Sequence, residues 1–147
     1  MDVIEIDRVF IMCNEVSETA KQFEDLLGLS FSDVIEGQIE FDKPEDVAAS
    51  LSRSGLELLA PREDDSVYGR FLAENGPGLF GISVRVEDID AAVDELSEKG
   101  VEPIGRFELN EFTEVFYEPE EFGGAYVVLT EYKTPHPAQV GWSDLSQ

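Results

Sequence analysis

The 147-residue sequence contains one cysteine, one histidine and few basic residues, and each scarcity excludes a class of protein. Cys13 alone cannot form a disulfide within the chain, so the fold is not expected to depend on cross-links. No apolar run approaches the roughly 18 residues that a membrane-spanning helix needs, and the N-terminal MDVIEIDRVF lacks the basic start and apolar core of a signal peptide. We therefore expect a cytoplasmic protein with no membrane partner.

The sequence is also poor in positively charged residues. The sequence has 33 acidic but only 10 basic residues, which gives a formal net charge of −23. A field of this sign repels nucleic acid and anionic lipid, so neither is an expected partner, and the acidic surface serves solubility first. A hydrophobic content of 42% with ten phenylalanines is sufficient to build the core of one folded domain.

Two segments of the chain repeat one pattern. DRVFIMCNEVSETAKQFEDLLGL and FGISVRVEDIDAAVDELSEKGV superimpose without a gap when Arg8 is set on Gly81, an offset of 81 − 8 = 73. Apolar residues then coincide at helical spacing, and a β-rich strand precedes each helix. The coinciding pairs are Val16 with Ile89, Ala20 with Val93, and Phe23 with Leu96.

Three further strand candidates follow each predicted helix, separated by turn-forming residues. They lie at 29–36, 46–52 and 55–60 in the first half, and at 101–108, 112–118 and 124–132 in the second. The sequence therefore predicts an α+β fold in which two tandem βαβββ modules, about 4–60 and 79–132, form one domain over 1–132. The linker 61–78 contains a short predicted helix near Tyr68–Glu74, and 133–147 is predicted to be an extended C-terminal tail.

This arrangement resembles the vicinal oxygen chelate superfamily, which includes glyoxalases, bleomycin resistance proteins, dioxygenases and methylmalonyl-CoA epimerases. The resemblance is nearest to the epimerase branch and extends over about residues 4 to 132. It is carried by IDRVFIMCNEVSETAKQFEDLLGL, LELLAPREDDSVYGRFLAENGPGLFGISVRVEDIDAAVDELSEKGV and VFYEPEEFGGAYVVL. It implies a cupped mixed sheet with a site between the two modules, although one fold of this kind hosts many chemistries.

In metal-using members, the ligands come from the first and last strands of each module. The resemblance places these positions at Arg8, Glu57, Gly81 and Val128. Only Glu57 offers a ligand atom, because guanidinium has no lone pair to donate, glycine has no side chain and valine is apolar. The single histidine, His136, lies in the tail between two prolines. We therefore expect a protein without the family metal and without a cofactor.

Strand alternation predicts which side chains line the cup. They are Arg8, Phe10, Met12, Leu59, Ser83, Arg85, Tyr126 and Val128, together with Glu57. Arg8 and Glu57 occupy positions that would share one ion, so they should lie close enough for an ion pair. That pair is either a structural cross-strand tie or a positive charge that holds a ligand oxygen in place of the metal.

Acid–base catalysis would require a carboxylate beside the reacting carbon. The candidate catalytic residues are Glu57, Arg8 and Tyr117, and Tyr117 is predicted to line the cup in preference to Glu114. Glu40 is a further acid near a second such place.

Three functions therefore stay open. The first is binding of a small organic molecule in the cup. The second is a metal-independent isomerase, epimerase or lyase that acts on an acyl-CoA or oxo-acid-like substrate. The third is an interaction subunit without a ligand, which a filled cup would favour. Arg62 and Arg70 in the linker either meet an anionic ligand tail or neutralise nearby acids. The resemblance is also compatible with a homodimer.

Overall fold

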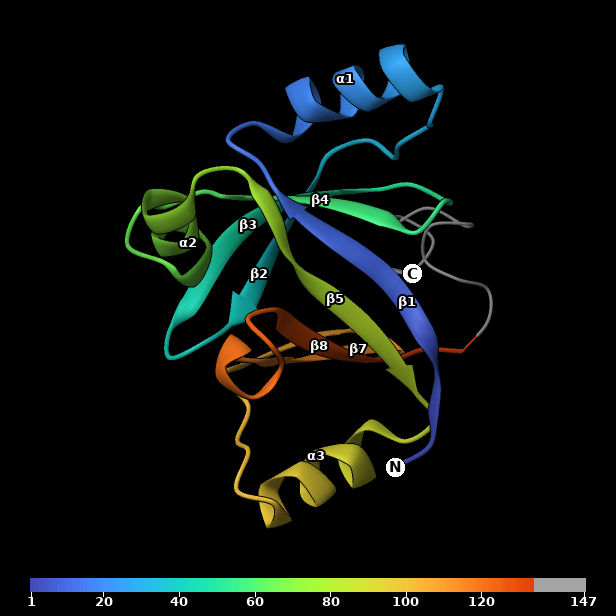
Figure 1. Ribbon diagram of the computed structural model, residues 1–147, viewed down its shortest axis with the longest axis vertical. Coiled ribbons are helices and arrows are strands. Elements are labelled where there is room, and N and C mark those ends of the chain that lie inside the picture. Colours follow the sequence, from blue (N-terminus) through green and yellow to red (C-terminus); the bar gives the residue numbers. More distant parts are fainter. Residues whose placement is uncertain (134–147) are drawn as a thin grey trace.

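Eight strands close into a barrel in the computed structural model, which describes residues 1–133 (Figure 1). The first module contains β1 (Val3–Met12), α1 (Val16–Leu27), β2 (Ile35–Glu40), β3 (Pro44–Leu51) and β4 (Leu56–Pro61). The second contains β5 (Gly78–Val86), α3 (Ile89–Glu98), β6 (Gly105–Leu109), β7 (Phe112–Tyr117) and β8 (Tyr126–Glu131). Between the modules lies α2 (Val67–Asn75), and a 3-10 turn (Pro119–Glu121) precedes β8. The predicted α+β fold of two βαβββ modules is confirmed.

Two strand boundaries differ from the prediction. The first segment, expected at 29–36, is mostly irregular, and Phe31 forms only an isolated bridge with Ser52. The strand expected at 101–108 begins at Gly105 instead, because Pro103 has no backbone N–H to donate to a neighbouring strand. The predicted tail lies outside the described residues from 134 onward. No helix among residues 1–133 is both long and apolar enough to cross a bilayer.

The two modules meet along two seams of very different extent. Around the barrel the strand order is β1-β4-β3-β2-β6-β7-β8-β5, with β1 parallel to β4 and β5 parallel to β8. Along one seam β1 and β5 run antiparallel through eight residue pairs. Along the other, β2 and β6 pair only at Glu40 and Arg106. The barrel is therefore closed, but unevenly.

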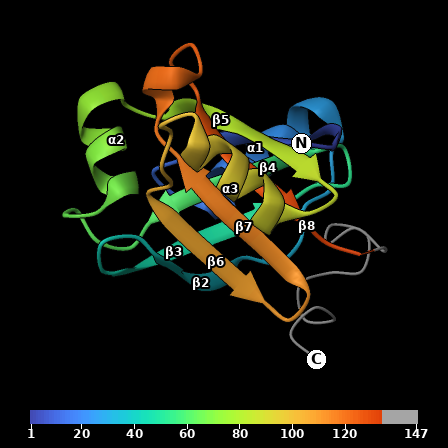
Figure 2. The same ribbon diagram turned by 90° about the horizontal axis from the view of Figure 1, so that it is seen from below.

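The two repeated helices cover opposite outer faces of the barrel (Figures 1 and 2). α1 buries Val16 and Ala20 against a cluster that includes Leu58 of β4. α3 begins at Asp88, whose side chain accepts a hydrogen bond from the Ala91 N–H at 3.0 Å, as expected of an N-cap. α2 lies instead at one end of the barrel, where it joins the interior core.

Candidate functional site

Arg8 lies at the centre of a buried polar cluster inside the barrel. Its side chain projects from β1, and the residue is only 2% exposed. The β1–β5 register shifts between Ile6 and Arg8, so the preceding Asp7 departs from strict alternation. As a result the Asp7 carboxylate is also buried, and it accepts a hydrogen bond from Arg8 Nε at 2.8 Å.

The other two guanidinium nitrogens bind residues of four further strands. Arg8 Nη1 pairs with Glu57 of β4, and Nη2 pairs with Glu114 of β7 at 2.7 Å. Nη2 also donates to the hydroxyls of Ser83 on β5 and Thr130 on β8, at 3.0 and 3.1 Å. We call these residues with Asp7 the Arg8 cluster. It ties five strands from both modules to one side chain.

The charges in the Arg8 cluster are unbalanced, because one cation meets three carboxylates. Burial lowers the pKa of Arg8, but Glu114, Glu57 and Asp7 outweigh it, so the guanidinium stays charged. Burial raises the pKa of Glu57 to about 7; Arg8 opposes this rise and Glu114 adds to it. Burial therefore favours the protonated form of Glu57 up to neutral pH.

The cluster does not fit the divalent ion of the family. The Arg8 side chain occupies one ligand position, and the buried Val128 contributes an apolar side chain at another. At Gly81 a β-carbon would lie 2.0 Å from the carbonyl oxygen of Tyr126, so no larger side chain fits there. Among residues 1–133, no three His, Cys, Asp or Glu side chains are grouped to hold one ion. We derive no chemistry through a metal.

Most of the residues predicted to line the cup do point into the barrel. Phe10, Met12, Leu59 and Val128 belong to the apolar core inside it, and Ser83 belongs to the Arg8 cluster. Arg85 lies apart from the cluster: its Nη2 donates to the Tyr132 carbonyl at 3.1 Å, and its guanidinium lies 4.0 Å from the Tyr132 ring centroid. Arg85 is thus occupied by protein groups.

The expectation that Tyr117 lines the cup and that Glu114 is exposed is wrong. Tyr117 packs with Val115 in the core beneath α3, and its hydroxyl has no hydrogen-bond partner within residues 1–133. Glu114 has the opposite orientation and joins the Arg8 cluster. Glu40 is exposed on β2, so it is not the second acid of the site. Alternation separated the two faces of β7 correctly but did not indicate which one faces inward.

The interior expected to be an open cup is filled. Beside Glu57 and Glu114 there remains an inner cavity of only about 30 Å³, the space of one water molecule. A chain of aromatic contacts closes the barrel toward α2. This ring layer consists of Phe41, Tyr68, Phe71, Phe80, Phe116 and Tyr126. Its tightest contact stacks Phe80 on Tyr126 with ring centroids 4.2 Å apart.

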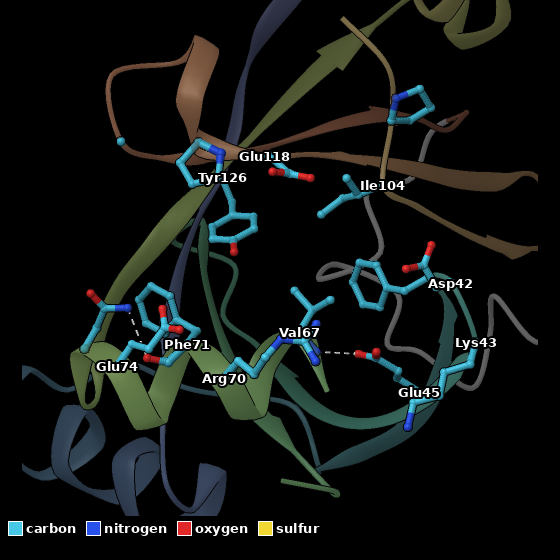
Figure 3. Close-up of a pocket in the computed structure, with 15 residues that line it drawn as sticks. Asp42, Lys43, Glu45, Val67, Arg70, Phe71, Glu74, Ile104, Glu118 and Tyr126 are labelled. Carbon is cyan, nitrogen blue, oxygen red and sulfur yellow. Dashed lines mark hydrogen bonds between the residues drawn. The ribbon is translucent and has the colours of Figure 1, made fainter. Parts of the chain in front are cut away.

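On the far side of the ring layer lies a larger hollow of about 670 Å³, which we call the outer pocket (Figure 3). Phe71 and Arg70 of α2 form one side of it, and Tyr126 projects toward it from β8. The turn between β2 and β3 and the loops before β6 and β8 complete its walls. Sequence reasoning placed Tyr126 at a wall but missed this pocket, because much of its lining comes from a turn and loops that have no periodic pattern.

Comparison with known proteins agrees with this architecture. Residues 7–113 match the model of the glyoxalase/bleomycin resistance protein/dioxygenase superfamily, and the chain belongs to that superfamily. No curated protein sequence matches the chain significantly.

Solved structures share the fold at low sequence identity. A methylmalonyl-CoA epimerase in complex with methylmalonyl-CoA and NH4+ is 22% identical with a TM-score of 0.70, over 90% of this chain and 97% of that one. The methylmalonyl-CoA epimerase of Mycobacterium tuberculosis is 24% identical with a TM-score of 0.65, over 90% of each chain. A hypothetical protein of Bacillus halodurans C-125 is 20% identical with a TM-score of 0.69, over 90% and 96%. Identities this low establish the fold alone.

Proposed function

We propose that this chain is a metal-free member of the superfamily that binds a small organic molecule in the outer pocket. The observation that carries the proposal is the pocket itself. Its volume of about 670 Å³ lies within the range of ligand sites, and its aromatic floor is formed by Phe71 and Tyr126. The Arg8 cluster then acts as a cross-strand tie where relatives hold an ion, since its nitrogens are already bonded to protein atoms.

A thermal-shift screen tests this proposal, combined with elemental analysis of protein purified without added ions. The screen contains acyl-CoAs, 2-oxo acids and aromatic compounds. A true ligand raises the melting temperature with concentration, because it binds only the folded state. Ile104→Trp replaces an aliphatic side chain that lines the outer pocket with a bulkier aromatic one and should abolish the shift, whereas Leu27→Trp on the exposed face of α1 should preserve it. A stoichiometric divalent metal, or a shift unaffected by Ile104→Trp, would contradict the proposal.

A second candidate function is a metal-independent isomerase or epimerase that uses the Arg8 cluster. It is favoured by one observation: Glu57, with a pKa near 7, shares the Arg8 guanidinium with a second buried carboxylate, Glu114. The small inner cavity weighs against it. Exchange of substrate protons with deuterated water, lost in Glu57→Gln, would favour this candidate over simple binding.

The filled interior also fits the third expectation, an interaction subunit without a ligand. The outer pocket is the feature that this alternative leaves unexplained, and we therefore place it behind the other two.

A further inference from the structure

Resting on the proposed function, we infer that the ligand of the outer pocket is an organic cation, an ammonium or related group on an apolar or aromatic body. The basis is the distribution of charge around the pocket. Four carboxylates and two cations line it. The carboxylates are Asp42, Glu45, Glu74 and Glu118, and the cations are Lys43 and Arg70.

Both cations are turned toward acids that do not line the pocket. Arg70 Nη1 lies 3.2 Å from Asp65, and Lys43 Nζ lies 3.8 and 3.9 Å from Glu63 and Asp65. The other linker arginine, Arg62, lies outside the pocket and pairs with Glu36. Lys43 and both linker arginines thus each have an acid nearby, which reduces the positive charge that they offer to an anionic ligand tail.

The four lining carboxylates have no such compensation. Within residues 1–133, none of them makes an ion pair of 4.0 Å or less. Burial is the main cause of the raised pKa of the Tyr126 hydroxyl, and the charges of Glu118 and Glu74 add to it. These two carboxylates therefore act on the pocket floor. Arg70 opposes that rise, but four carboxylates outnumber two cations, so the pocket carries net negative charge beside aromatic rings.

Glu45 provides an independent observation, because it is a carboxylate that is only 3% exposed. One of its oxygens, Oε1, accepts a hydrogen bond from the Val67 N–H at 2.8 Å and so caps the first turn of α2 (Figure 3). The N-terminus of α2 offsets part of the charge. The second oxygen has no hydrogen-bond or ion-pair partner among the described residues, although Glu45 lines the pocket. This second oxygen is not sealed inside the protein, so a cationic ligand in the pocket would pair with it directly.

The aromatic lining suits the same ligand. Phe41, Phe71 and Tyr126 present ring faces and edges to the pocket, where a cation is attracted to the π-system and an apolar body is removed from water. An anionic acyl-CoA tail would meet repulsion from the same carboxylates. Ring and carboxylate together therefore select a cation with an apolar part.

Three probes that share a phenyl ring on a four-carbon chain test the inference by calorimetry at pH 7. They are phenylbutylammonium, phenylbutanol and phenylpentanoate, which differ only in a positive, neutral or negative end. At about 0.15 M salt, where charges beyond roughly 8 Å are screened, we expect the ammonium to bind at least about tenfold more tightly than the alcohol. We expect the carboxylate to bind most weakly.

Two variants remove charge from the pocket. Glu45→Gln keeps an oxygen for the Val67 N–H, and Glu118→Gln changes an exposed loop residue. Each should weaken ammonium binding by about three- to thirtyfold and leave alcohol binding unchanged. Glu24→Gln, on the exposed face of α1, loses the same unit of net charge and should change ammonium affinity less than about twofold.

The outcomes separate this inference from the proposed function. Equal binding of all three probes, tighter binding of the carboxylate, or no binding of the ammonium overturns the cation inference. An ammonium affinity that falls equally in Glu24→Gln also overturns it, because the attraction would then be general. Binding that is insensitive to Ile104→Trp overturns the outer pocket as the site, and with it the proposed function.

Discussion

The carbonyl oxygen of Tyr126 lies 2.0 Å from the point that a β-carbon on Gly81 would occupy. Because Gly81 and Tyr126 are partners in the parallel pairing of β5 with β8, the strand backbone itself fills the place of a side chain. At this position relatives with a metal are expected to carry a histidine. The metal position in the second module is therefore closed by main chain as well as by the loss of a ligand.

Gly81→His should consequently fail to create a metal site. We expect it to lower the free energy of unfolding by at least about 2 kcal/mol, because the backbone of β8 must move. Gly37→Ala on β2 is the matched control, since its β-carbon would make an ordinary 3.9 Å contact with Phe107, and the change should stay within about 1 kcal/mol. Urea denaturation with and without zinc measures both effects, and zinc stabilisation of the histidine variant would refute this account.

Removal of Arg8 tests whether the Arg8 cluster is a structural tie. Arg8→Met leaves Asp7, Glu57 and Glu114 without their cation, so we expect a loss of about 3–5 kcal/mol of stability. Adding Glu57→Gln and Glu114→Gln should recover part of that loss. Ligand affinity should be unchanged if the ligand occupies the outer pocket, and a fall in affinity without a fall in stability would assign Arg8 to binding.

The raised pKa of Glu57 predicts that the stability of the fold depends on pH, and in which direction. Its pKa is raised in the folded state to about 7, chiefly by burial, so between its ordinary pKa and about 7 the folded chain holds a proton that the unfolded chain has lost. Stability should therefore fall as pH rises through this window and level off above it, by on the order of 1–3 kcal/mol. The difference between wild type and Glu57→Gln isolates this group from general carboxylate repulsion. A difference that grows toward high pH in favour of wild type would show the opposite shift.

Two buried tyrosine hydroxyls differ in whether they have a hydrogen-bond partner: Tyr117 on β7 has none within residues 1–133, and Tyr132, after β8, binds Asp7. Burial raises the pKa of Tyr117 to about 12, and Tyr117→Phe removes a hydroxyl without a partner in the described chain, so stability should hold or rise by up to about 1 kcal/mol. Tyr132→Phe removes a 2.6 Å hydrogen bond to Asp7 and should cost about 1–3 kcal/mol. Neither change should alter ligand binding, and a loss of binding in Tyr117→Phe would restore its predicted role.

The repeated pattern was sufficient to predict the modules, because they depend on periodicity, whereas the meeting of Arg8 with Glu57 was predicted from the ligand positions that the family resemblance implies. Periodicity could not predict Asp7 or Phe80. Both lie at register shifts between β1 and β5, where one extra residue sends a side chain to the other face. Phe80 packs in the ring layer against Tyr68 and Tyr126.

The outer pocket was beyond sequence reasoning for a related cause. Its acids come from a turn, a helix and two strand ends, at positions where a glutamate is normally a solvated surface residue. Only the three-dimensional arrangement shows that Glu45 is buried and that the arginines of the linker are already paired.

The two modules are joined firmly by β1 and β5 on one side of the barrel, but on the other side β2 and β6 pair only at Glu40 and Arg106. Residues of β2 and β6 next to this pair line the inner cavity beside Glu57 and Glu114. Local fluctuations begin where main-chain bonds are fewest, so solvent protons would reach these two carboxylates where β2 and β6 separate.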